Sequence, residues 1–281
     1  MPRVSTSPNR NHWKSEAGAD VESFILYLAL GSFAGVMAGL LGVGGGLVIV
    51  PALVAIWQAN GVQSAHIMHL AVGTSLATIV LTSVSSVRAH HVHGAVVWRR
   101  VLQLTPGIVL GAWLGAAVAA GLPGGVLKNI FGVFELAAAA QLAFGRPPGS
   151  RRHLPGRLGM GVAGGVIGVL SAILGIGGGT LTVPFLTWCG VSIQKAVATS
   201  AACGLPIALA GGLAYVVMGW QAAGLPSLAA GYVYLPAFGG VALASVLAAP
   251  LGARLAHHLS PTALKRVFAL FLVALGVWML G

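Results

Sequence analysis

Long apolar runs separated by short polar or basic loops form the pattern of this chain. A run of about 20 apolar residues is long enough to cross a bilayer as one helix. Membrane-spanning helices are therefore predicted at residues 66–87, 101–121, 126–144, 196–219, 229–253 and in the last run, which ends at residue 281. Two further runs, residues 24–56 and 158–189, are too long for one crossing and too short for two complete ones.

A run of glycines interrupts each of these two longer segments at a matching place. Gly42-Val43-Gly44-Gly45-Gly46 precedes Pro51 in the first, and Gly175-Ile176-Gly177-Gly178-Gly179 precedes Pro184 in the second. Each glycine in a helix costs about 1 kcal/mol relative to alanine, so a duplicated run indicates an interruption that the fold requires. We expect a short helix to begin just after the third glycine of each run.

The glycine run belongs to a longer internal repeat. Ala71-Val72-Gly73-Thr74-Ser75 returns as Ala196-Val197-Ala198-Thr199-Ser200, and a shared Leu-Lys pattern occurs at residues 127–131 and 264–268. Duplicated units are common in transporters. The predicted organisation is a polar N-terminal tail at 1–23, a first transmembrane repeat at 24–144, a basic linker at 145–157 and a second transmembrane repeat at 158–281.

Composition assigns the chain to a class. Of its 281 residues 57% are hydrophobic and only 7% are charged, whereas about 25% of the residues of soluble domains are charged. We therefore predict an all-α polytopic membrane protein. The net charge of +11 does not indicate nucleic-acid binding, because the Lys and Arg residues lie between apolar segments and form no basic helix face. Cys189 and Cys203 lie in or beside apolar runs, where they are expected to be small buried residues.

The distribution of positive charge predicts the topology. Basic loops at 88–100, 145–157 and 254–266 are placed in the cytoplasm, and the uncharged loops at 57–65 and 220–228 are placed outside. Counting crossings then requires both glycine-broken segments to leave and return on the same side, from opposite sides of the membrane. Each half becomes a broken hairpin or re-entrant helix pair plus three transmembrane helices. The two halves are inverted relative to each other, with both termini outside.

The two glycine breaks are the candidate substrate site. The first N–H groups of a helix lack intrahelical partners and carry the positive end of its dipole, so two such helix starts meeting near the midplane would bind an anion without a buried cation. The alternative is that the glycines only permit close packing. The predicted substrate-binding residues are Gly44, Gly45, Gly46, Thr74, Ser75, Gly177, Gly178, Gly179, Thr199 and Ser200.

Other polar residues in or near the spans have two interpretations each. The Thr-Ser pairs are either site hydroxyls or ordinary interhelical hydrogen-bonding groups. Pro51 and Pro184 either free a carbonyl toward a cavity or only kink their helices. Glu135 is the only acid within a span, where it either carries a coupling proton or is a protonated structural group.

Histidines do not indicate a metal site in this sequence. His90, His91 and His93 lie in a basic stretch without a carboxylate or cysteine partner, so a solvated loop is favoured over a metal centre. His66 and His69, one turn apart at the outer end of a span, either titrate or are interface residues. No metal or cofactor is implied.

The motifs together resemble the TauE/SafE family of sulfite-exporter-like permeases. The resemblance rests on both Gly-x-Gly-Gly-Gly-x4-Pro motifs, on the two Thr-Ser pairs and on the run at residues 231–236, and it covers residues 24 to 281. It implies a bacterial inner-membrane carrier that exports sulfite or an organosulfonate such as sulfoacetate, with proton coupling as the expected energy source. A homodimer is left open.

Two alternatives to a carrier are less consistent with the sequence. A passive anion channel is disfavoured because inverted repeats with broken helices favour alternating access. An intramembrane enzyme is disfavoured because it would need acidic, His or Cys groups at membrane depth, where Glu135 stands nearly alone. The sequence therefore predicts a transporter and not an enzyme.

Overall fold

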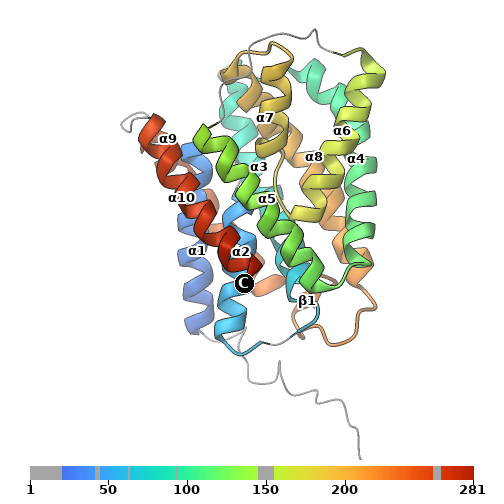
Figure 1. The fold of residues 1–281 in the computed structure, drawn as a ribbon, viewed down its shortest axis with the longest axis vertical. Helices are drawn as coiled ribbons and strands as arrows, with labels where there is room; N and C mark the ends of the chain where they lie inside the picture. The colour runs from blue at the N-terminus through green and yellow to red at the C-terminus, as the bar shows by residue number, and fades with distance from the viewer. Residues whose placement is uncertain (1–20, 42–44, 63, 93, 145–154, 256–260) are drawn as a thin grey trace, which may run out of the picture.

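The computed structural model describes residues 21–41, 45–62, 64–92, 94–144, 155–255 and 261–281. These ranges form a helical bundle with one short two-stranded hairpin (Figure 1). The helices are α1 (Val21–Leu41), α2 (Gly46–Ala59), α3 (Ile67–Val92), α4 (Trp98–Ala120), α5 (Gly124–Phe144), α6 (Arg157–Leu174), α7 (Gly179–Trp188), α8 (Ile193–Gly219), α9 (Leu235–Leu255) and α10 (Pro261–Leu280). Strands β1 (Ala229–Ala230) and β2 (Val233–Tyr234) pair antiparallel before α9.

Helix length and polarity confirm the predicted class, an all-α polytopic membrane protein. In the described ranges seven helices are long and apolar enough to cross a membrane. Large apolar side chains cover the outside of the bundle: Leu110 is 74% exposed and Leu247 is 69% exposed. Such a surface suits lipid and would be unfavourable in water.

Several helix boundaries differ from the sequence expectation. Helix α3 continues to Val92, so His90 and His91 lie in its last turn and not in a loop. Helix α9 begins only at Leu235, because residues 229–234 form the hairpin that precedes it. Neither change alters the number of apolar crossings.

Each of the two longer apolar runs forms a pair of helices, α1 and α2 from the first run and α6 and α7 from the second. In Figure 1, α1 and α2 both reach the lower end of the bundle, whereas α6 and α7 both reach the upper end. The short helices α2 and α7, of 14 and 10 residues, therefore enter the interior from opposite ends. The broken hairpin or re-entrant character of each pair stays a prediction, because α1 and α6 are themselves long and apolar enough to cross a membrane. The division into two inverted repeats stays a prediction, although the helix contacts are also paired: α4 packs on α6 as α1 packs on α9.

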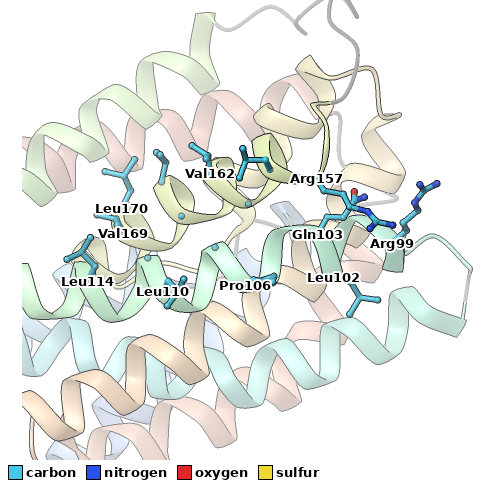
Figure 2. A pocket seen from close by; sticks show the side chains of 16 residues that line it. Arg99, Leu102, Gln103, Pro106, Leu110, Leu114, Arg157, Val162, Val169 and Leu170 are labelled. Atoms are coloured by element: carbon cyan, nitrogen blue, oxygen red, sulfur yellow. The ribbon is translucent and has the colours of Figure 1, made fainter.

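Glycines allow the backbones of two helix pairs to touch. A Cβ added to Gly35 of α1 would lie 2.7 Å from Cα of Ser245 in α9. In the second pair, a Cβ on Gly111 of α4 would lie 3.0 Å from Cα of Gly165 in α6, and these two helices run side by side (Figure 2). Glycines at four-residue spacing thus serve close helix packing, as in other membrane bundles.

Candidate functional site

The two glycine breaks meet inside the bundle. Helix α2 begins at Gly46 and α7 begins at Gly179, which is in each case the last of three consecutive glycines. A Cβ on Gly46 would lie 2.8 Å from Cα of Ile176, so the first break packs directly on the second. Gly175 has a φ of 66°, a left-handed conformation that residues with a side chain rarely adopt. Glycine is therefore required at the contact for two separate physical reasons.

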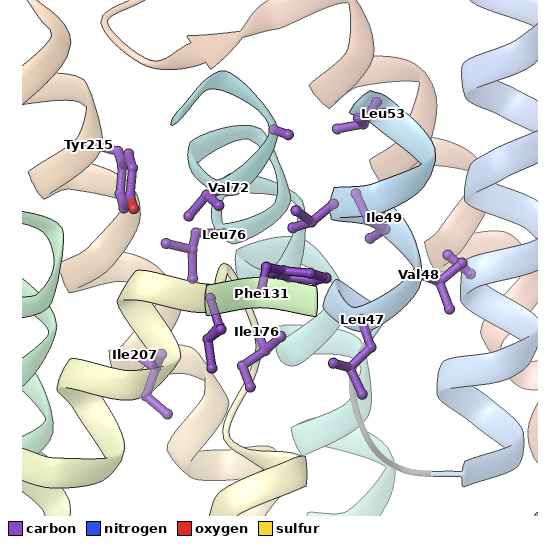
Figure 3. Packing of buried hydrophobic residues seen from close by; sticks show 14 of the residues in the cluster. Leu47, Val48, Ile49, Leu53, Val72, Leu76, Phe131, Ile176, Ile207 and Tyr215 are labelled. Atoms are coloured by element: carbon purple, nitrogen blue, oxygen red, sulfur yellow. The ribbon is translucent and has the colours of Figure 1, made fainter. Parts of the chain in front are cut away.

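Apolar side chains enclose the place where the breaks meet. Phe131 of α5, Leu47 of α2 and Ile176 of the second break belong to one buried apolar cluster, whose side chains are drawn in Figure 3. Interrupted backbone in contact with lipid would cost several kcal/mol for each unsatisfied group. The packing keeps the second break and the described part of the first, Gly45 and Gly46, inside protein, which is the condition under which a membrane helix tolerates an interruption.

A cavity of about 540 Å³ lies beside the two breaks. Helices α1, α2, α3, α7, α8 and α9 all contribute to its wall. Its polar lining consists of glycine backbone and hydroxyl groups, with His90 near the end of α3; among the described residues no carboxylate, lysine or arginine lines it. The glycines and hydroxyl residues are Gly35, Gly39, Gly45, Gly177, Gly178, Gly179, Gly204, Thr82, Ser83, Ser85, Ser86, Ser200 and Ser245.

The cavity runs from the buried centre toward one end of the bundle. Ser200 is fully buried, whereas Ala89, in the last turns of α3, is exposed. That end of α3 leads into the basic stretch 88–100. The lining of the cavity therefore reaches the end of the bundle that the charge distribution assigns to the cytoplasm.

Helix α7 directs its N-terminus at this cavity. The first helical N–H groups with acceptors within α7 are those of Leu181 and Thr182, which donate to the Gly178 carbonyl at 3.3 and 2.7 Å. The N–H groups of Gly179 and Thr180 precede them, and no side chain caps the helix at Gly178. Uncapped N–H groups and the helix dipole make this end a suitable anion site.

Hydroxyl groups surround the start of α7. The Ser200 Oγ is buried and finds no hydrogen-bond partner in the described part of the chain. A Cβ on Gly204 would lie 3.0 Å from the Ser83 Oγ and 3.9 Å from the Gly178 nitrogen, so these groups converge. A buried hydroxyl without a partner costs about 1–3 kcal/mol, which a bound ligand would recover.

The predicted threonines have structural partners. The Thr74 hydroxyl accepts a hydrogen bond from the Tyr234 N–H at 2.9 Å, directly before α9. The Thr199 hydroxyl accepts one from the Val97 N–H at 3.0 Å, directly before α4. Each threonine thus supports the start of a helix in the other half of the chain, and neither lines the cavity.

The predicted serines differ from each other. The Ser75 Oγ donates to the Gly175 carbonyl at 2.8 Å and so holds the second glycine break in place. Ser200, its counterpart in the sequence repeat, has no such bond and faces the cavity. Of the four predicted hydroxyl residues, the structure brings only Ser200 to the cavity together with the glycines.

The remaining predicted site residues are distributed unevenly. Gly45 and the three glycines of the second break line the cavity, while Gly46 packs on the second break and Gly44 lies outside the described residues. Pro51 and Pro184 are the sixth residues of α2 and α7 and do not line the cavity. Glu135 is fully buried in α5, away from the cavity, and its carboxylate oxygens find no partner among the described residues.

Some lining residues were missed by the sequence reasoning. Thr82, Ser83 and Ser86 lie on α3 at helical spacing, and Ser245 lies on α9. The spacing of the α3 hydroxyls was visible in the sequence and indicates a polar face on an otherwise apolar span. Ser245 donates to the Gly31 carbonyl at 2.8 Å, so it supports the α1–α9 contact as well.

Histidines have structural contacts at both ends of the bundle. Trp98 donates through Nε1 to the His91 Nδ1 at 3.1 Å. At the other end, a His69 ring nitrogen lies 3.0 Å from the Ala119 carbonyl, and its ring packs 5.1 Å from that of Tyr232. The described residues contain no group of three or more His, Cys, Asp or Glu that could hold a metal ion, and His93 lies outside them.

A helical multi-pass bundle has the features of a membrane transporter when glycine backbone and hydroxyl groups line a cavity beside two interrupted helices. The family model described as "Sulfite exporter TauE/SafE" matches residues 27–279, and the chain belongs to this family. The resemblance seen in the sequence motifs is thereby confirmed.

Relatives agree with this assignment. A probable membrane transporter protein of Haemophilus influenzae is 37% identical, with 90% of this chain and 96% of that protein aligned. One of Methanocaldococcus jannaschii is 28% identical over 91% of this chain and 94% of its own length. No solved structure matches the chain. The family and these relatives are transporters, which confirms that the chain is not an enzyme.

Proposed function

We propose that the protein is a secondary carrier that exports a small sulfur-containing anion, either sulfite or an organosulfonate such as sulfoacetate. The observation that carries the proposal is the uncapped N-terminus of α7, which faces a cavity together with the unpartnered Ser200 hydroxyl. These groups donate hydrogen bonds and carry no net charge. A neutral donor site holds an anion without the tight ion pair that would slow its release.

Two features support the direction of export. The lining of the cavity reaches the end of the bundle that carries Arg88, Arg99 and Arg100, which the positive-inside rule assigns to the cytoplasm. Basic residues near a mouth raise the local concentration of anions. The family's description as a sulfite exporter supports the same direction and cargo. In this orientation both termini are outside, in the inner membrane of a bacterium, and a C-terminal reporter active only in the cytoplasm would contradict it.

Coupling to the proton gradient is part of the proposal. Glu135 is the proposed proton carrier because it is a carboxylate buried inside a span without a described hydrogen-bond partner. Transport of the anion that saturates with concentration and is stimulated by a pH gradient supports a coupled carrier. Flux that does not saturate and ignores the gradient favours the alternative, a passive anion channel.

The test uses proteoliposomes with the anions sulfite, sulfoacetate and thiosulfate, and with taurine, a sulfonate whose ammonium group makes it a zwitterion of no net charge. Ser200→Ala removes the unpartnered donor and is expected to weaken the transported anion's apparent affinity about tenfold or more, since a hydrogen bond to a charged group contributes about 1.5–3 kcal/mol. Ser171→Ala is the matched control, because Ser171 is equally buried and unpartnered among the described residues but does not line the cavity. Equal affinities in the two variants would overturn the proposed site.

A further inference from the structure

A second hollow lies on the outside of the bundle, between α4 and α6. It is an open groove of about 1070 Å³, and its walls are almost entirely apolar. Gly161 and Gly165 lie along it, and a Cβ added to Gly161 would meet no atom within 4 Å. The close packing of α4 on α6, and the glycines of α6 that have no side chain, therefore leave this groove open on a surface that faces lipid.

Polar groups gather at one end of this groove. Figure 2 shows Arg99, Gln103 and Arg157 at that end and leucine and valine side chains along the rest. Arg99 is in the first turn of α4 and Arg157 is the first residue of α6, so two helix N-termini add their positive dipole ends to two guanidinium groups. Arg100 donates to the Gln103 side-chain oxygen at 2.8 Å and brings a third cation near this end.

Among the residues that the structure describes, no carboxylate is placed to neutralise this charge. The only acids are Glu16, Asp20, Glu22 and Glu135. Glu135 is buried in α5, and Glu22 lies in the first turn of α1, at the opposite end of the bundle from the starts of α4 and α6 (Figure 1). Glu16 and Asp20 lie outside the described residues. A second copy in the same membrane has the same orientation, so its described residues would bring arginines and no carboxylate to this end. The described part of the protein therefore supplies no anionic partner for these arginines.

We propose that this groove binds one anionic glycerophospholipid of the cytoplasmic leaflet, with the phosphate at Arg99 and Arg157 and an acyl chain along Gly161 and Gly165. Guanidinium groups bind phosphate oxygens in bidentate geometry. From Arg99 to Leu114 the groove extends about 22 Å at 1.5 Å per helical residue. One leaflet including its headgroups is about 20–22 Å thick, so the groove matches the length of a single lipid.

The other glycine-packed pair provides an internal contrast. Helices α1 and α9 pack through Gly31 and Gly35 in the same manner, but their first turns contain no lysine or arginine. The basic groove is therefore specific to α4 and α6, and the lipid is expected at one end of the bundle only. The proposal is independent of the transported anion, because none of the groove residues lines the central cavity.

The test is native mass spectrometry of the delipidated full-length protein, titrated with phosphatidylglycerol or with phosphatidylcholine of the same acyl chains. Wild-type protein is expected to bind one molecule of phosphatidylglycerol more tightly than it binds phosphatidylcholine. Arg99→Gln and Arg157→Gln should each weaken this binding about fivefold, since a basic residue near the membrane surface contributes about that factor. Arg88→Gln is the control, because Arg88 is a basic residue of the same end that does not line the groove.

A second pair of variants tests the acyl part of the site. Gly161→Leu places a side chain in the groove from a Cβ that meets no atom within 4 Å, and it should abolish the preference for one bound lipid. Gly239→Leu on α9 is its control, because a Cβ there also meets nothing within 4 Å. Unchanged binding of phosphatidylglycerol by a variant that combines Arg99→Gln and Arg157→Gln overturns the proposal. The proposal is also overturned if soluble glycerol 3-phosphate competes with phosphatidylglycerol as well as the intact lipid does, because the site would then bind a phosphate and not a lipid. A dimer mass that disappears in Gly161→Leu would overturn it as well, because a second copy of the protein would then occupy the groove.

Discussion

The two glycine breaks have the same sequence motif and different environments. The first break closes against the second, because Gly46 packs on the backbone at Gly175 and Ile176. The second break leaves the start of α7 open to the cavity and is held from behind by the Ser75 hydroxyl. A duplicated motif therefore does not imply a duplicated role, since one copy supports the site and the other copy forms most of it.

The largest expected effect separates the two glycines at the start of α2. Gly46→Ala places a methyl group within 2.8 Å of the Ile176 backbone and should destabilise the protein by more than about 3 kcal/mol, because backbone must move. Gly45→Ala meets mainly the flexible end of Ile49 at 3.1 Å and should cost about 1 kcal/mol or less. Yield and thermal unfolding in detergent measure both. Similar stability of the two variants would mean that the first break is not a packing contact.

The next effect separates the two serines. Ser75→Ala leaves the buried Gly175 carbonyl without its donor and should lower stability by about 1–3 kcal/mol. Ser200→Ala removes no hydrogen bond within the described residues and should leave stability unchanged within about 0.5 kcal/mol, while it weakens transport. Thermal unfolding and flux are measured on both variants. Loss of stability in Ser200→Ala without loss of affinity would reverse the assigned roles.

The smallest effect tests where the two halves remain alike. Thr74→Val and Thr199→Val each leave a backbone N–H at a helix start without its acceptor, and each should cost about 1 kcal/mol. Thr105→Val is the control, since its hydroxyl donates only within its own helix at 2.8 Å. The comparison is made by thermal unfolding at one detergent concentration. Clearly unequal losses of stability in the two threonine variants would show that the two halves are alike in sequence but not in these hydrogen bonds.

Sequence reasoning identified the elements better than their partners. The glycine runs predicted both interruptions, because the low helix propensity of glycine is a local property of the chain. The roles of Ser75 and Ser200 were not predictable, since the partner of Ser75 is 100 residues away. Identical dipeptides in a repeat have identical local preferences, and only the packing around them decides which hydroxyl is left for a ligand.

The glycine contacts between α4 and α6 and between α1 and α9 also have a mechanical consequence. Helices whose backbones touch have no layer of side chains that can rearrange between them, so each pair is expected to move as a rigid body. Hinges are then expected between these pairs, and the glycine runs before α2 and α7 have the backbone freedom that a hinge requires. In that arrangement the glycines that line the candidate site are also the hinges about which the helix pairs around the cavity rotate.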